Sequence, residues 1–428
     1  MYFVNVIRNF LYMVISLIIL VIYALISFFL LYKSNVIEEK NKKIVAVLLL
    51  VMAFGVRYLN LNHVSQDYII FLSEWIQTFK DNGGLKGLSE SVGNYNIPYL
   101  AILALISYLN DNWLIAIKLI SIFFDIVLAW SAMKIVEKCT NDKKKQLICF
   151  FAVLLLPTVI IDGSYWGQCD VIYVSLGILG INFALDNKPW LSMISIAMSF
   201  AFKLQAVFIM PIYAVLLMKR KVKWYHFIAF PIVYILMISP ALIAGRPFLE
   251  TLLLYTTQTD TVGTGYSYNA PSLLAIVDAG RTLLAFLNTD TAIPIVSKIA
   301  TAVAMTAVIV LLVFALVNRD RISDYIIILT MGLLTVVIPY LLPHMHDRYF
   351  FCADVLTLIL MIIDCSFAPV FILIAGSSLW CYFCYYRYIM TQATGSIYLG
   401  SFAIFIGLVY FILKYIRAIN KDELRLKD

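Results

Sequence analysis

Charged side chains are scarce in this chain: Asp, Glu, Lys and Arg make up 13% of its 428 residues, whereas hydrophobic residues make up 63%. In an ordinary globular domain the charged share is roughly 25% and the apolar share roughly 45–50%. A soluble fold of this length cannot bury so much apolar surface. The composition therefore excludes disordered, disulfide-framework and nucleic-acid-binding proteins, and it predicts an all-α, polytopic membrane protein with a single domain over residues 1–428.

Metal-ligand and targeting patterns are also lacking. None of the seven cysteines has the spacing of a metal ligand, and the nearest pair, Cys381 and Cys384, lies in an apolar aromatic stretch. A zinc or redox site is therefore not indicated. The first apolar run, residues 10–32, is long enough to span and has no small-residue cleavage site, so we expect a membrane helix there instead of a cleavable signal.

Runs of about 20 apolar residues, the length that spans a bilayer, recur along the chain and predict about twelve to fourteen membrane helices. They lie near residues 10–32, 44–60, 114–136, 146–162, 171–186, 190–218, 225–244, 293–317, 324–342, 350–365, 367–386 and 397–416. The run 190–218 is too long for one upright helix and carries Lys203 at its middle, so we expect two short helices that meet at Lys203. Residues 96–110, opened by Pro98, predict a short re-entrant or interfacial helix.

The formal net charge of +7 comes from basic clusters that flank the apolar runs. These clusters lie at residues 40–43, 143–145, 219–223, 319–321 and 414–427. Such a pattern is typical of cytoplasmic loops, and a polyanion site is the less favoured alternative. The remaining loops are then external, at residues 61–95, 162–170, 203–205, 245–292, 343–349 and 387–396. We therefore expect a multi-pass protein of the plasma membrane with its polar site on the external face.

The two largest external loops have distinct patterns. In residues 67–80 apolar and polar side chains alternate with helical spacing, which predicts an amphipathic juxtamembrane helix on the membrane surface. The loop 245–292 contains a polar, flexible segment that ends near Tyr268 and Asn269. We expect the loop 61–95 to carry catalytic chemistry and the loop 245–292 to cover the substrate.

Asp67 opens the first external loop, directly after an apolar run. One interpretation is a helix N-cap, a position that Asp favours. The other is a carboxylate at the mouth of a membrane cavity, placed to take a proton from a hydroxyl nucleophile. The residue pattern alone does not decide between them.

The segment 162–170 joins two apolar runs through a turn that is dense in hydrogen-bonding groups. Trp166 is explained equally well by anchoring at the membrane interface. Interface anchoring does not explain Gln168 and Asp170, for which we favour contact with a substrate.

The segment 343–350 holds two of the four histidines, His344 and His346, followed by Arg348. A zinc site would need a third ligand such as Asp67 or Asp170, and the i, i+2 spacing of the histidines is a weak metal signal. A cationic cluster that grips a phosphate is favoured, because Arg supplies planar paired donors. Lys203 at the helix break is the expected second cation. Other charges within apolar runs, at Lys118, Asp125, Lys298, Asp354 and Asp364, are candidates for interhelical ion pairs.

Taken in order, these segments resemble the GT-C superfamily of integral-membrane glycosyltransferases, in particular bacterial relatives of the mannosyltransferases of glycosylphosphatidylinositol assembly. The resemblance covers about residues 50 to 355 and consists of an Asp in the first external loop, Asn-Tyr-Asn-x-Pro-Tyr at 94–99, Trp-Gly-Gln-x-Asp at 166–170, Phe-Lys-x-Gln-Ala at 202–206 and Pro-His-Met-His-x-Arg-Tyr-Phe at 343–350. The apolar run 10–32 before the first-loop Asp departs from the family pattern.

The resemblance implies a polyprenyl-phosphate-linked hexose (mannose, glucose or galactose) as donor, inversion at the anomeric carbon, and a lipid-linked or cell-envelope glycan as acceptor on the external face. It implies Asp67 as the catalytic base, and Lys203, His344, His346 and Arg348 near the donor phosphate. Trp166, Gln168, Asp170, Gln205, Tyr268 and Asn269 would contact the sugar or acceptor. Because Gln66 precedes Asp67 there is no double-aspartate metal motif, and neither a metal nor another cofactor is implied.

The expected partners are the lipid donor, the glycan or lipid acceptor and membrane lipids, with no nucleic acid, and the oligomeric state stays open. A transporter or flippase of a lipid-linked saccharide is the alternative function. The enzyme is favoured because the acidic groups gather on one face, whereas alternating access needs a site that opens to both sides.

Overall fold

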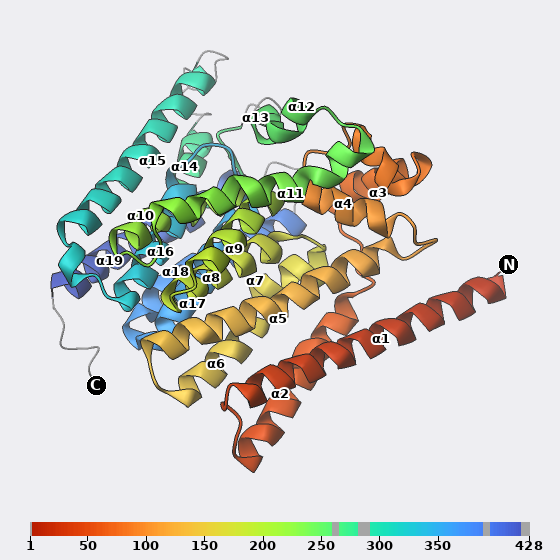
Figure 1. The fold of residues 1–428 in the computed structure, drawn as a ribbon, viewed down its shortest axis with the longest axis horizontal. Helices are drawn as coiled ribbons and strands as arrows, with labels where there is room; N and C mark the ends of the chain where they lie inside the picture. Colours follow the sequence, from red (N-terminus) through yellow and green to blue (C-terminus); the bar gives the residue numbers. More distant parts are fainter. Residues whose placement is uncertain (1, 259–264, 281–291, 388–393, 421–428) are drawn as a thin grey trace.

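The computed structural model describes residues 2–258, 265–280, 292–387 and 394–420, and these form a bundle of helices (Figure 1). Parts of two predicted external loops, 259–264 and 281–291 of the loop 245–292 and 388–393 of the loop 387–396, lie outside the described residues. So do residues 421–428 of the C-terminal basic cluster. The described chain confirms an all-α polytopic membrane protein.

The first half of the chain contains helices of very different lengths. They are α1 (Tyr2–Lys33), α2 (Lys40–Asn60), η1 (Tyr68–Leu72), α3 (Ser73–Asp81), η2 (Gly84–Ser89), α4 (Ile97–Ile106), α5 (Trp113–Cys139), α6 (Lys143–Leu154), α7 (Pro157–Ile160), η3 (Ile161–Trp166), α8 (Asp170–Leu185), α9 (Pro189–Phe202), η4 (Leu204–Phe208) and α10 (Ile212–Met218).

The second half adds the elements that close the bundle. They are η5 (Trp224–Ile228), α11 (Ala229–Ala244), α12 (Phe248–Leu252), α13 (Leu254–Gln258), β1 (Ser267–Tyr268), α14 (Leu273–Gly280), α15 (Ala292–Val317), η8 (Arg319–Arg321), α16 (Asp324–Leu341), β2 (Met345–His346), η9 (Asp347–Phe350), α17 (Phe351–Ile363), η10 (Cys365–Phe367), α18 (Ala368–Arg387) and α19 (Thr394–Asn420).

Eight helices among the described residues are long and apolar enough to cross a membrane, or nine if the pair Lys143–Leu154 and Pro157–Trp166, bent by 42°, is one span. The helices formed in the apolar runs at 171–186, 190–218 and 350–365 are shorter than a membrane span: α8 has 16 residues, α9 has 14 and α17 has 13. The reason is burial: α8 and α17 are apolar on all sides because other helices, not lipid, surround most of their surface. An apolar run thus predicts that a helix forms there, but it does not predict that the helix is long enough to span a membrane.

The predicted break at Lys203 is confirmed. Its backbone is extended, with φ −153° and ψ 134°, and it separates α9 from η4. The predicted short helix after Asn96 is also present as α4. The Asn96 side chain accepts a hydrogen bond from the backbone N–H of Ile97, and Pro98 occupies the first turn, so both residues define where the helix begins.

The amphipathic segment of the first external loop folds as η1 followed by α3. Ile76 and Phe79 are buried, and α3 packs against α4. On the other side Ile69, Ile70 and Phe71 are exposed. This exposed apolar edge is what a helix lying at a membrane surface requires.

At the centre of the bundle α8 packs against both α5 and α9, and α18 packs against α17 and α19. Figure 1 places α1 and α15 at opposite edges. A buried ion pair joins α2 to α5: Arg57 Nε lies 2.8 Å from Asp125 Oδ2, and neither side chain has exposed surface. Asp125 was predicted to form an interhelical ion pair with an unidentified residue, and Arg57 is that residue.

Candidate functional site

The Asp67 carboxylate is the centre of a hydrogen-bond network. Its Oδ2 accepts from Trp166 Nε1 at 3.0 Å, Gln168 Nε2 at 2.6 Å and Arg348 Nη1 at 2.9 Å. Its Oδ1 accepts from the Tyr385 hydroxyl at 2.8 Å. Although Asp67 directly precedes η1, its side chain makes no capping bond to that helix. The N-cap explanation of this residue therefore does not apply.

Local backbone geometry presents these groups. Two π-helical turns flank the network: η1 begins immediately after Asp67, and η3 ends at Trp166. Such turns are rare and occur frequently at functional sites. Gly167 follows with φ +82°, a left-handed conformation that favours glycine and turns the chain so that Gln168 also faces Asp67.

Hydrogen bonds from Lys118 and Ser65 hold the start of the first external loop against this turn. Lys118, on α5, donates to the carbonyl oxygens of Asn60 at 2.8 Å and His63 at 2.6 Å. Ser65 Oγ donates to the carbonyl oxygen of Trp166 at 2.7 Å. Because these bonds bracket the end of α2 and the start of the loop, they set the position of Asp67 relative to Trp166.

A second carboxylate extends the network to both cations. Lys203 Nζ lies 2.7 Å from Asp170 Oδ1, and Arg348 Nε lies 3.5 Å from Asp170 Oδ2. The Arg348 guanidinium also stacks over the Trp166 ring, 4.9 Å from its centroid. Arg348 therefore bridges Asp67 and Asp170, so that two carboxylates balance two cations in this group.

His346 faces the cavity from the segment after α16. Its ring stacks on Tyr268, with centroids 5.0 Å apart and planes 19° apart. The strand β1 pairs in parallel with β2, and Asn269 bridges to His346, so this part of the loop 245–292 is fixed against the histidine segment. Desolvation inside the cavity, with the positive charges of Arg348 and Lys203, lowers the pKa of His346 below its usual value, although His346 is itself exposed. At neutral pH His346 is thus an uncharged hydrogen-bonding group.

His344 has a different environment from His346. Its Nδ1 lies 2.8 Å from the carbonyl oxygen of Gly265, and its Nε2 lies 3.1 Å from Ser297 Oγ. Its backbone N–H donates to the carbonyl oxygen of Tyr266 at 2.8 Å, with φ +60°. His344 borders the cavity, yet both ring nitrogens already contact protein atoms, so its main effect is to hold the loop over the site.

Three site residues were not singled out as candidates from the sequence: Tyr95, Asp347 and Tyr385. The Tyr95 hydroxyl donates to Gln168 Oε1 at 3.3 Å, and Asp347 Oδ1 accepts from the backbone N–H of Arg348 at 2.9 Å. Burial raises the pKa of Asp347 to about 7. Two signals existed: Tyr95 lies in the Asn-Tyr-Asn segment, and Tyr385 ends an apolar run at the expected external face.

These groups surround one cavity of about 550 Å³. Its wall consists of Asp67, Phe71, Leu72, Trp75, Asn94, Tyr95, Asn96, Gln168, Phe202, Lys203, Leu204, Gln205, Tyr255, Tyr268, Asn269, His344, His346, Asp347, Arg348, Tyr349 and Tyr385. All the predicted site residues are in this list except Trp166 and Asp170. Both of these are fully buried and support the wall from behind through Asp67, Lys203 and Arg348.

Gln205 adds an open hydrogen-bonding group to the wall. Its Oε1 is buried and has no hydrogen-bond partner among the described residues. A buried acceptor without a partner is costly, so a donor on a bound molecule would be stabilised there. Within the described part of the chain, no group of three or more His, Cys, Asp or Glu side chains is arranged to hold a metal ion.

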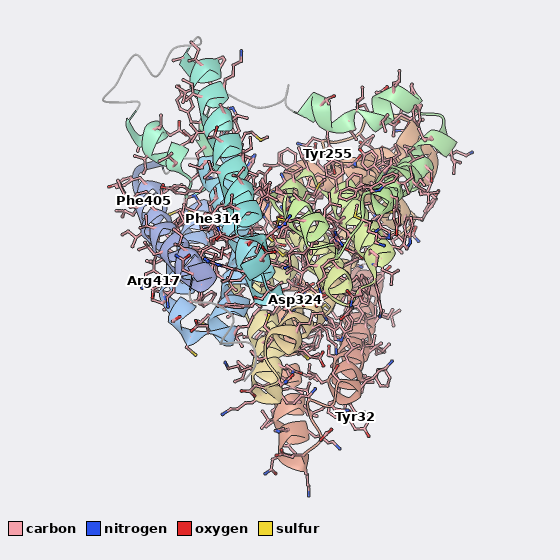
Figure 2. All side chains as sticks on the ribbon, turned by 60° about the vertical axis from the view of Figure 1, so that its left-hand side comes forward. Tyr32, Tyr255, Phe314, Asp324, Phe405 and Arg417 are labelled. Carbon is pink, nitrogen blue, oxygen red and sulfur yellow. The ribbon has the colours of Figure 1, made fainter. Side chains whose placement is uncertain are left out.

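The cavity lies away from the basic clusters. Figure 2 shows Tyr255, which lines the cavity, higher in the molecule than Asp324 and Tyr32. Tyr32 is beside the cluster 40–43, with Lys43 Nζ 5.3 Å from its ring centroid, and Asp324 pairs with Lys221 at 3.3 Å. The polar site and the basic loops therefore occupy opposite ends of the bundle.

Fold and site together define an all-helical, multi-pass membrane protein with a charged, partly enclosed cavity at one end. Comparison of the chain with family models finds no match, and comparison with curated proteins finds none either.

Proposed function

We propose that the protein is an inverting glycosyltransferase that moves a hexose from a polyprenyl phosphate to a lipid-linked or cell-envelope glycan. The observation that carries the proposal is the cavity, in which one carboxylate, Asp67, accepts a hydrogen bond from Arg348 and is connected to Lys203 through Arg348 and Asp170. A hydroxyl acceptor needs a base and an anionic lipid-phosphate leaving group needs cations. The cavity supplies both.

In the proposed reaction Asp67 takes the proton of the acceptor hydroxyl while the acceptor oxygen forms a bond to the anomeric carbon. The bond between that carbon and the phosphate oxygen breaks, and the electron pair leaves with the polyprenyl phosphate. Arg348 and Lys203 stabilise the charge that develops on the phosphate. His346, uncharged at neutral pH, offers a hydrogen bond to the donor without adding charge.

The contacts of Arg348 define an order of steps in which its positive charge always faces a negative group. Its guanidinium now occupies one lone pair of Asp67 Oδ2 and stacks on Trp166. A donor phosphate would compete for this guanidinium, because phosphate and guanidinium match as paired acceptors and donors. Arg348 would then turn from the carboxylate to the phosphate and leave Asp67 free for the acceptor.

The proposal assigns the reaction to the external face of the plasma membrane. It is supported by the separation of the cavity from the basic loops, since such loops remain in the cytoplasm. The apolar surface between helices suits a prenyl chain, and no step is assigned to a metal or other cofactor.

The decisive experiment incubates purified protein with polyprenyl-phosphate mannose, glucose and galactose, together with a lipid-extract acceptor, and measures released polyprenyl phosphate. We expect one donor to be consumed, and Asp67→Asn to lower the rate by about 10²–10⁴-fold, the usual contribution of a general base. Asp81→Asn is the matched control, because Asp81 is a carboxylate at the end of α3 that bonds Gln77 and does not line the cavity.

Undiminished turnover by Asp67→Asn would refute the role of this carboxylate. In liposomes, passage of an intact lipid-linked saccharide across the membrane without any new glycosidic bond would instead establish the alternative of a transporter or flippase.

A further inference from the structure

A second, apolar cavity of about 280 Å³ lies between α9, α10 and α11. Its wall consists of Met193, Ile196, Met210, Tyr213, Phe227, Phe230 and Pro231. The Tyr213 hydroxyl bonds to Ser192, three residues after the start of α9. The cavity is therefore near the end of the bundle that carries the basic clusters, away from Asp67.

The cavity opens toward the surface of the bundle. Phe227, on its wall, and the neighbouring Ile228 are exposed, whereas Met193 and Ile196 at its base are buried. A groove with an apolar base and an exposed apolar rim in a membrane protein suits an alkyl chain. This geometry by itself does not choose among lipids.

Aromatic side chains mark the level of the membrane surface beside this groove. The Trp190 ring packs edge-on against His226, with centroids 4.8 Å apart, and lies 6.2 Å from Tyr225. Trp224 is 79% exposed. Trp and Tyr gather at the depth of lipid headgroups, so the groove begins where a headgroup would lie.

Basic residues lie at the ends of the helices that line this groove, just before α9, just after α10 and just before η5. Lys188, Arg220 and Lys223 are exposed and have no ion-pair partner among the described residues. Lys219 and Lys221 add two more cations, although Lys221 is paired with Asp324. Clusters of four or more basic residues next to membrane helices attract anionic lipid headgroups.

Arg220 occupies a backbone position at which glycine would be less strained. Its φ is +58°, and it ends α10, with its N–H bonded to the carbonyl oxygen of Leu217. In this left-handed conformation most residues with a Cβ are disfavoured. A long cationic side chain is thus kept at a strained position just after α10, the helix that contributes Tyr213 to the groove wall, and this favours a role for its charge.

We infer that this end of α9, α10 and α11 is a binding site for an anionic diacyl phospholipid. One acyl chain lies in the apolar groove, and the headgroup phosphate contacts Arg220, Lys188 and Lys223. Charge complementarity selects an anionic headgroup over a zwitterionic one. The inference is independent of the proposed sugar transfer, because it uses none of the residues around Asp67.

The test is native mass spectrometry of the protein in mixtures of phosphatidylglycerol and phosphatidylcholine with identical acyl chains. We expect one phosphatidylglycerol to remain bound preferentially. Arg220→Gln/Lys223→Gln should weaken its apparent affinity roughly tenfold to thirtyfold, as expected for the loss of two cations near a membrane surface. Lys40→Gln/Lys144→Gln removes two exposed cations from other basic clusters and should leave that affinity within about twofold.

Ile196→Trp fills the groove and should displace the lipid while the basic rim is intact. Equal loss of affinity in the Lys40→Gln/Lys144→Gln control would overturn the inference, because binding would then be diffuse. It would also be overturned if Ile196→Trp bound phosphatidylglycerol normally, or if polyprenyl phosphate displaced that lipid from the native protein.

Discussion

Asp347 shows how burial at a single residue creates a dependence on pH. Its pKa is raised by burial from 3.8 to about 7, so the folded protein favours the protonated form. The stabilisation is fully present below pH about 4, declines as pH rises, and is lost once pH has passed about 7. The carboxyl is next to Arg348, which lowers its pKa in part but not enough to cancel the effect of burial.

We therefore predict that Asp347 contributes a fall in the thermal unfolding midpoint of the purified protein between pH about 4 and about 7, opposed by His346, whose lowered pKa adds stability as pH rises through most of that range. Asp347→Asn should remove the falling contribution, so that its midpoint declines less or rises over this range relative to the parent protein, while Asp81→Asn should retain the parent profile. The measurement is thermal unfolding in detergent over that range. A profile unchanged by Asp347→Asn would assign the slope to other groups.

At the residue scale the sequence predicted the chemical types in the site better than their contacts. Asp67, Gln168, Lys203 and Arg348 were recognisable because polar groups within apolar surroundings need a reason. Tyr385 was not, since a Tyr in an aromatic run is equally well explained by packing. It is 318 positions from its partner, and only the fold brings the two together.

Among the helices, the break after α9 shows how a charge pair stabilises an interruption. Lys203 is extended and buried, and its ammonium neutralises Asp170, which has no exposed surface. Removing one member of a buried pair leaves an uncompensated charge, whereas removing both does not. The 3.5 Å contact of Asp170 with Arg348 offsets part of this cost.

We predict that Lys203→Met lowers the free energy of unfolding by about 3 kcal/mol, at the lower end of the range for a broken buried pair. The double variant Lys203→Met/Asp170→Asn should recover most of that loss, because no buried charge is left alone. It should not recover sugar transfer, since the phosphate would still lack a cation. Unfolding midpoints and donor turnover, measured on the same samples, separate the two effects.

The break after α9, the start of α4 and the burial of α8 show what hydropathy predicts and what it does not. An apolar run of 29 residues with a central Lys was enough to place the break, and Asn96 followed by Pro98 was enough to begin α4. Hydropathy did not show that α8 is covered by other helices and not by lipid. A helix covered by other helices is as apolar as one covered by lipid.

Across the whole molecule, the Arg57–Asp125 pair fixes α2 to the central helix α5. Arg57 also donates to the carbonyl oxygen of Ala53 at 3.0 Å. Because both side chains are fully buried, the pair contributes to how the helices assemble, and neither of them lines the cavity.

We predict that Arg57→Leu destabilises the protein by about 3–5 kcal/mol, and that Arg57→Leu/Asp125→Leu restores much of the stability. Transfer per folded molecule should be preserved in the double variant. Thermal unfolding with an activity assay normalised to folded protein checks this. A double variant less stable than Arg57→Leu would show that the charges also satisfy groups elsewhere.

The opposite placement of cavity and basic loops was predicted from charge alone, since Lys and Arg concentrate on one side of a membrane protein. The size of the cavity was not predicted from the sequence. The cavity is enclosed by segments far apart in the chain, among them η1, η4, β2 and α18, and such packing leaves no local signal in composition.

The hydrogen bond between Asp67 and Tyr385 joins the first loop of the chain to one of its last helices. Synthesis proceeds from the N-terminus, so Asp67 enters the membrane long before its hydroxyl partner and before Arg348. A nascent chain thus carries the carboxylate for most of its synthesis without the groups that complete the site. The hydrogen-bond network around Asp67 is therefore complete only after α18 has been synthesised, and a fragment that ends before Tyr385 lacks one of its donors.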